Sequence, residues 1–172
     1  AQHWRDARIA PIYEGTNGIQ AADLVGRKLP MEGGRVVKAE LARMRETLDE
    51  LAAVDELADL APPLAAAIDR LGEAGDWLIG RLGVEPNDAM AGSSAYLRLF
   101  GVVEGGHDLA RSALVAHRAL ADGGSGYGDE FLTDKITVAR FYVQRLLPES
   151  AALVEMATAG AETTFALPDS RL

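Results

Sequence analysis

The residues with the clearest chemical potential lie near the start of the chain, where residues 5–20 read RDARIAPIYEGTNGIQ. Pro11 discourages helix in the residue before it, and Gly15 and Gly18 permit turns and the close approach of a ligand. We therefore expect a helix, a turn and a second helix, with Glu14 on the turn. The N–H groups at a helix start favour an anion or a carboxylate base at that place. Taken alone, however, a glutamate on a turn is most often a solvated surface residue.

The elements that must position this turn are helices, because the apolar residues after residue 34 alternate at spacings of four and three. We expect Pro62 and Pro63 to end the first helix, and proline in a first turn can also begin the next one. We expect Pro148 to bend or break the fourth helix. The pattern predicts an all-α fold, an up-down four-helix bundle preceded by a helix-turn-helix segment. The four expected seams include Val37, Leu41, Met44, Leu48 and Leu51; Leu64, Ile68, Leu71, Leu78 and Leu82; Leu99, Val103, Ala110, Ala113 and Leu120; and Leu132, Ile136, Ala139, Val143 and Leu146.

Composition excludes several classes of protein. The 172 residues contain no cysteine, which rules out disulfides, thiolate zinc sites and iron–sulfur clusters. The formal net charge of −9 argues against nonspecific binding to nucleic acid or an anionic membrane. No apolar run approaches the roughly 18 residues of a membrane span.

A Pro-Met-Glu-Gly-Gly stretch at residues 30–34 reads as a linker, so we divide the chain into residues 1–34 and residues 35–172. The first part carries four basic and four acidic side chains, and the second part therefore carries all of the net charge. The chain starts in amphipathic sequence without a helix cap, so we expect it to be a piece of a longer protein.

The remaining polar and glycine-rich features have simpler interpretations. The three histidines are not spaced as metal ligands, and we expect packed or surface side chains and no metal site. The glycine-rich residues 123–128 read as a connector, and an acidic run within residues 46–59 reads as a solvated face. Three glycines of the third helix suggest close packing against a neighbour or a kink. These histidines and glycines are His3, His107 and His117, and Gly101, Gly105 and Gly106.

The string IYEGTNGIQ at residues 12–20 resembles the C-terminal signature of the acyl-CoA dehydrogenase family. The likeness is dense over residues 2–29 and includes DLVGRKL at residues 23–29. Residues 35–165 resemble an extra C-terminal helical domain found in large bacterial members of the 3-methylmercaptopropionyl-CoA dehydrogenase type.

This resemblance implies an FAD-dependent enzyme that oxidises an acyl-CoA thioester to a trans-2-enoyl-CoA. Glu14 matches the catalytic base of the family, while Tyr13 and Gly15 match substrate-binding positions. The resemblance also implies electron-transferring flavoprotein as electron acceptor, a homo-oligomer and a location in the bacterial cytoplasm. The stretch that contacts FAD corresponds to Thr16, Asn17 and Gly18.

Complete members of the family have further domains, which supply most of the flavin pocket and the CoA channel. We therefore expect the 172-residue chain alone to lack a complete active site and to be inactive. The alternative is a protein of another class, a non-catalytic helical module for oligomerisation or interaction.

Overall fold

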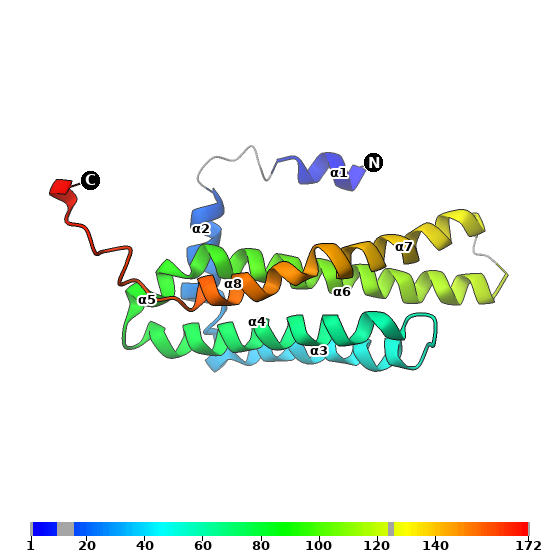
Figure 1. Cartoon of the computed structure of the whole chain (residues 1–172), viewed down its shortest axis with the longest axis horizontal. Helices are drawn as coiled ribbons and strands as arrows, with labels where there is room; N and C mark the ends of the chain where they lie inside the picture. The colour runs from blue at the N-terminus through cyan, green and yellow to red at the C-terminus, as the bar shows by residue number, and fades with distance from the viewer. Residues whose placement is uncertain (1, 10–15, 124–125, 172) are drawn as a thin grey trace.

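The computed structural model describes residues 2–9, 16–123 and 126–171. Four long helices run antiparallel in up-down order: α3 (Arg35–Ala52), α4 (Ala61–Leu82), α6 (Ser93–Ala121) and α7 (Asp129–Arg145), with α8 (Ser150–Ala157) continuing the direction of α7 (Figure 1). The described residues contain no strand. The predicted all-α four-helix bundle is confirmed.

The core of the bundle consists of the apolar seams that the spacing predicts. The most deeply buried of these seam residues come from all four long helices, are at most 6% exposed and belong to one cluster. Five other predicted seam residues are partly buried, namely Val37, Leu48, Leu82, Leu120 and Ile136. Leu146 is 44% exposed, because α7 ends at Arg145 and the following Leu147 takes the buried place at 1% exposed. The buried seam residues are Leu41, Met44, Leu51, Leu64, Ile68, Leu71, Leu78, Leu99, Val103, Ala110, Ala113, Leu132, Ala139 and Val143.

The first bundle helix ends much earlier than predicted. α3 stops at Ala52, whereas the two prolines lie in the first turn of α4, as the sequence allowed. The apolar seam of α3 has its last member at Leu51, and the next seam position is the polar Asp55. The chain therefore reverses over residues 53–60, where Leu57 and Leu60 are buried and close the end of the helical hairpin.

The third predicted helix is divided into α5 (Pro86–Ala91) and α6. Gly92 lies at the junction, where a Cβ atom would collide with the carbonyl group of Ala157 in α8. The absence of a side chain at this position thus allows the junction to approach the end of the bundle closely.

Close packing of α6 against its neighbours is confirmed at Gly105 and Gly106, whereas Gly101 lies at an open position. A Cβ atom on Gly105 would lie 2.7 Å from the hydroxyl of Tyr142, which donates a hydrogen bond to the carbonyl of Val102 at 3.1 Å. The predicted break at Pro148 is confirmed, because a single 3₁₀ turn, Leu147–Glu149, separates α7 from α8.

The N-terminal part comprises α1 (Gln2–Ala7), α2 (Thr16–Asp23), a π-helical turn (Leu24–Lys28) and a 3₁₀ turn (Met31–Gly34). No residue of α1 is buried, whereas α2 crosses the bundle and contacts α6 (Figure 1). Val25 and Leu29 belong to the same apolar cluster as the bundle helices. The division of the chain at residue 34 stays a prediction.

The acidic run within residues 46–59 forms a solvent-exposed face, as predicted. All six of its carboxylate residues are exposed: Glu46, Asp49, Glu50, Asp55, Glu56 and Asp59. Three of them lie within ion-pair distance of side chains on α6 or α7, such as Glu50 with Arg118 at 2.6 Å. Of the helices that the structure describes, none combines the length and apolar composition that a bilayer crossing requires.

Candidate functional site

The predicted site residues fall at and before the start of α2. Thr16, Asn17 and Gly18 form the first turn of this helix. Tyr13, Glu14 and Gly15 lie outside the described residues. In sequence, Glu14 comes two positions before the first helical residue, so α2 is the element that anchors this part of the motif from its C-terminal side.

The first turn of α2 is accessible. Asn17 and Gly18 are exposed, and the Cβ position of Gly18 has no atom within 4 Å. Asn17 lines a hollow of about 320 Å³ together with Ser94, Leu97 and Arg98 of α6. Because a helix start has N–H groups without intrahelical partners and a partial positive charge, this turn can receive polar or anionic groups of a ligand.

The second half of the motif holds α2 on the bundle. Val25 and Leu29 are buried, and the N–H of Leu29 donates to the carbonyl of Leu24 at 2.7 Å, which closes the π-helical turn. On the outer side, Asp23 accepts hydrogen bonds from Arg27 at 2.6 and 2.9 Å. These bonds hold the pKa of the Asp23 carboxyl below its usual value.

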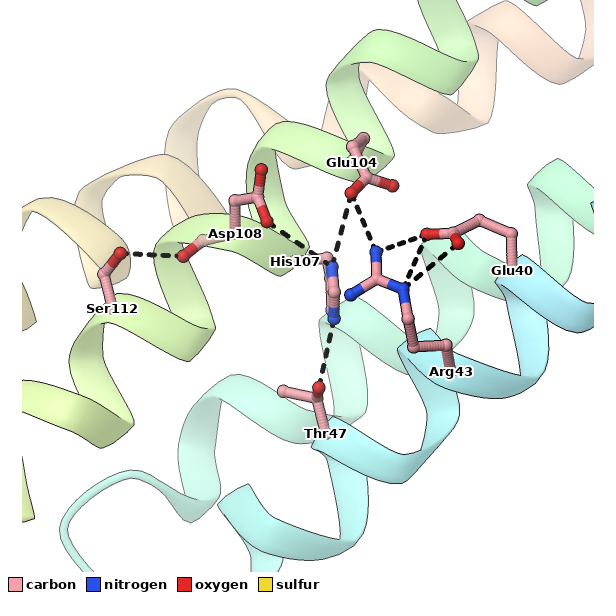
Figure 2. A network of polar contacts seen from close by, with 7 residues as sticks. All are labelled: Glu40, Arg43, Thr47, Glu104, His107, Asp108 and Ser112. Carbon is pink, nitrogen blue, oxygen red and sulfur yellow. Dashed lines mark hydrogen bonds and ion pairs between the residues drawn. The ribbon is translucent and has the colours of Figure 1, made fainter.

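A second polar cluster lies between α3 and α6, and sequence reasoning did not identify it (Figure 2). His107 is fully buried, with Nε2 at 3.0 Å from the hydroxyl oxygen of Thr47. Its Nδ1 lies 3.6 Å from Oε1 of Glu104 and 3.9 Å from Oδ1 of Asp108, and it has no hydrogen-bond partner. The prediction that the histidines are packed or surface residues is confirmed for His107.

Arg43 connects the cluster across the two helices. Its guanidinium donates to both carboxylate oxygens of Glu40 on α3 and to Oε1 of Glu104 on α6 at 3.1 Å (Figure 2). The hydrogen bonds from Arg43 lower the pKa of Glu40, and burial, with the charge of Arg43 second, lowers the pKa of His107. His107 is therefore favoured in its neutral form.

Two spacings in the sequence could have indicated this cluster. Glu104 and His107 are three residues apart and Asp108 follows directly, while Arg43 and Thr47 are four apart. Such spacings place side chains on one face of a helix. The sequence does not say that these two faces meet, because that depends on the register of α3 against α6.

Known proteins resemble this chain over most of its length. The family model for the "Acetyl-CoA dehydrogenase C-terminal like" domain matches residues 40–168. The chain is 42% identical over 153 residues to the 3-methylmercaptopropionyl-CoA dehydrogenase of Ruegeria pomeroyi, covering 88% of this chain and 26% of that protein.

Two further relatives are more distant. The broad-specificity linear acyl-CoA dehydrogenase FadE5 of Mycobacterium tuberculosis is 31% identical over 86% of this chain and 25% of its own length. The butyryl-CoA dehydrogenase of Syntrophomonas wolfei is 30% identical over 84% of this chain and 24% of its own length. The chain thus spans about a quarter of the length of the curated relatives that it matches. By its family match, its helical fold and these relatives, the chain belongs to the acyl-CoA dehydrogenase family and carries the C-terminal helical domain of that family.

Proposed function

We propose that the whole protein containing this chain oxidises an acyl-CoA thioester to a trans-2-enoyl-CoA. The observation that carries this proposal is the IYEGTNGIQ motif, which leads directly into an accessible helix start anchored on the bundle. The 42% identity to an enzyme named as a 3-methylmercaptopropionyl-CoA dehydrogenase supports the same reaction class.

In this proposal Glu14 is the catalytic base that removes the α-proton of the substrate. The α-carbon of a thioester is a poor acid in water, so the negative charge that develops on the thioester oxygen needs hydrogen-bond donors. The backbone N–H of Glu14 is one such donor. Exclusion of water by the bound substrate raises the pKa of the Glu14 carboxylate and makes it a stronger base.

The neighbours of Glu14 shape the place where the thioester lies. Gly15 has no side chain that could obstruct the approach of the thioester to the base. Tyr13, which precedes the base, lines the acyl pocket in this proposal.

Thr16, Asn17 and Gly18 are the residues that we propose to contact FAD. The described turn fits this role, since Asn17 and Gly18 are exposed and the space at Gly18 is open. When bound, FAD accepts the hydride that leaves the β-carbon of the substrate. The start of α2 would offer its partial positive charge and polar side chains to the cofactor, with the remaining contacts supplied by the rest of the protein.

We further propose the partners that follow from this assignment: electron-transferring flavoprotein as electron acceptor, a homo-oligomeric protein and a cytoplasmic location. Residues 1–34 would carry the catalytic turn, and residues 35–172 would form the appended helical domain.

The test is Glu14→Gln in the whole protein, which keeps the size of the side chain and removes the base. We expect kcat to fall by about 10²–10⁴-fold with FAD content unchanged. Glu162→Gln, at an exposed glutamate after α8, is the matched control and keeps full activity. A Glu14→Gln protein that oxidises acyl-CoA at the control rate would contradict the proposal and favour a non-catalytic role for this segment.

A further inference from the structure

Three potential metal ligands lie on one turn of α6, outside the predicted catalytic segment. Glu104, His107 and Asp108 each present one ligand atom, and these atoms all lie within 4.8 Å of one another. Figure 2 shows both carboxylates directed at the imidazole ring. Their spacing of three and four residues places them on the same helix face.

The imidazole of His107 is fully buried and has an unsatisfied nitrogen aimed at the two carboxylates. If Nε2–H donates to Thr47, then Nδ1 carries a lone pair that faces negative oxygens. If Thr47 donates to Nε2 instead, then Nδ1–H points toward Glu104 at 3.6 Å, which is too long for a hydrogen bond. The second oxygen of Glu104, Oε2, is also buried without a partner.

The polar cluster has a net negative charge that a bound cation would neutralise. Glu40, Glu104 and Asp108 contribute three carboxylates against the one guanidinium of Arg43, which leaves two negative charges beside a neutral imidazole. Arg43 donates hydrogen bonds to Glu40 and contacts only one carboxylate oxygen, Oε1, of Glu104.

Two basic side chains line the same cavity as Asp108. Arg111 and Lys135 line a cavity of about 630 Å³ next to Asp108. Within the part of the chain that the structure describes, neither forms an ion pair with Asp108. Asp108 is 64% exposed, so an ion could enter from that side.

The distances suit a small transition-metal ion. Two ligand atoms that lie about 2.1 Å from zinc at a tetrahedral angle are about 3.4 Å apart. The separations from Nδ1 are 3.6 Å to Glu104 and 3.9 Å to Asp108, so small side-chain rotations would bring all three atoms into coordination distance. Imidazole as a ligand favours zinc over magnesium or calcium.

We propose that Glu104, His107 and Asp108 form a binding site for one divalent transition-metal ion, with Zn²⁺ as the best candidate and water completing its coordination. Nδ1 of His107 is the nitrogen ligand, and Nε2–H donates to Thr47, which orients the ring from α3. Arg43 lies beside the ion and opposes its charge, so its removal strengthens binding.

The site is tested by titrating the 172-residue chain with Zn²⁺ alone in an isothermal calorimeter. The expected result is one saturable site per chain. Asp108→Asn changes an exposed ligand and leaves the core intact, and we expect it to weaken Zn²⁺ binding at least about tenfold. Thr47→Val removes the hydroxyl that orients the ring and weakens binding by a similar factor. Arg43→Gln binds Zn²⁺ more tightly than the unaltered chain.

The controls separate this site from adventitious binding. Asp134→Asn removes an exposed carboxylate on α7, and a double His3→Ala, His117→Ala variant removes the other two histidines. Both bind Zn²⁺ as the unaltered chain does. Absence of one-to-one binding overturns the proposal, and so does Asp108→Asn binding with unchanged affinity. Neither result bears on Glu14, because acyl-CoA oxidation does not enter this assay.

Discussion

A buried tyrosine, Tyr96, and a partly buried one, Tyr142, test the packing, because loss of the hydroxyl is expected to have opposite effects on stability at the two positions. Tyr96 is fully buried in the core, and its hydroxyl has no hydrogen-bond partner in the described structure. Tyr142 is also largely covered, but its hydroxyl donates to the carbonyl of Val102 at 3.1 Å. Burial raises the pKa of both phenols above the ordinary value, so both are neutral at neutral pH.

The expected magnitudes follow from the two environments. A buried polar group without a partner costs about 1–3 kcal/mol, so Tyr96→Phe is expected to raise the free energy of unfolding by about 1 kcal/mol. Tyr142→Phe removes one hydrogen bond and leaves the Val102 carbonyl with one acceptor contact fewer, which lowers the free energy of unfolding by about 1 kcal/mol. For a chain of this size, 1 kcal/mol corresponds to a shift in Tm of about 2–4 °C.

The assay is urea unfolding of the 172-residue chain and its two variants, followed by circular dichroism, with thermal unfolding as a second measurement. Most substitutions in a core destabilise a protein, so a Tyr96→Phe variant that is more stable than the unaltered chain would specifically support an unpaired Tyr96 hydroxyl. If Tyr96→Phe destabilises the chain as much as Tyr142→Phe does, the Tyr96 hydroxyl has a partner and the account of this part of the core is wrong.

Three further predictions concern the junction, the motif and the chain as a whole. Gly92→Ala places a methyl group against the carbonyl of Ala157 and is expected to lower the free energy of unfolding by about 3 kcal/mol. Gly101→Ala, at an open position of α6, should raise the free energy of unfolding by about 0.8 kcal/mol in the same denaturation assay. If the two alanine substitutions change the free energy of unfolding equally, the packing described at Gly92 is wrong. The Asp23 carboxyl should titrate below its ordinary pKa of 3.8 when followed by NMR, and Arg27→Gln should move that midpoint upward. Because this pKa is lowered in the folded chain, the stabilisation is present above pH 3.8 and is lost as pH falls through the folded pKa. Finally, the 172-residue chain alone should be colourless and should not oxidise acyl-CoA; a yellow, active preparation would refute the expectation that other domains complete the site.

The bundle could be predicted from the sequence because each helix buries one stripe of apolar residues. The seam from Leu64 to Leu78 and the break at Pro148 are examples in which local spacing and backbone chemistry determine the element. The predicted end of α3 is wrong because Pro62 and Pro63 are not what stops this helix: the polar Asp55 at the next seam position already marks the end of the buried stripe.

Contacts between distant segments could not be predicted in this way. The approach of His107 to Thr47, and of Arg43 to Glu104, depends on how α3 is shifted along α6. The collision that a side chain at Gly92 would cause depends on where α8 ends. Spacing within one helix contains no information on either relation. The catalytic prediction at Glu14 came from the motif, and the structure describes its C-terminal anchor, α2.

The most direct test of the central claim is a crystal structure of the whole protein with FAD and a bound acyl-CoA. We predict that a carboxylate oxygen of Glu14 lies about 3–3.5 Å from the α-carbon of the thioester, in the position of a base ready to take the proton. The first turn of α2 should contact the cofactor. A Glu14 side chain turned away from the substrate, with a different carboxylate beside the α-carbon, would contradict the account.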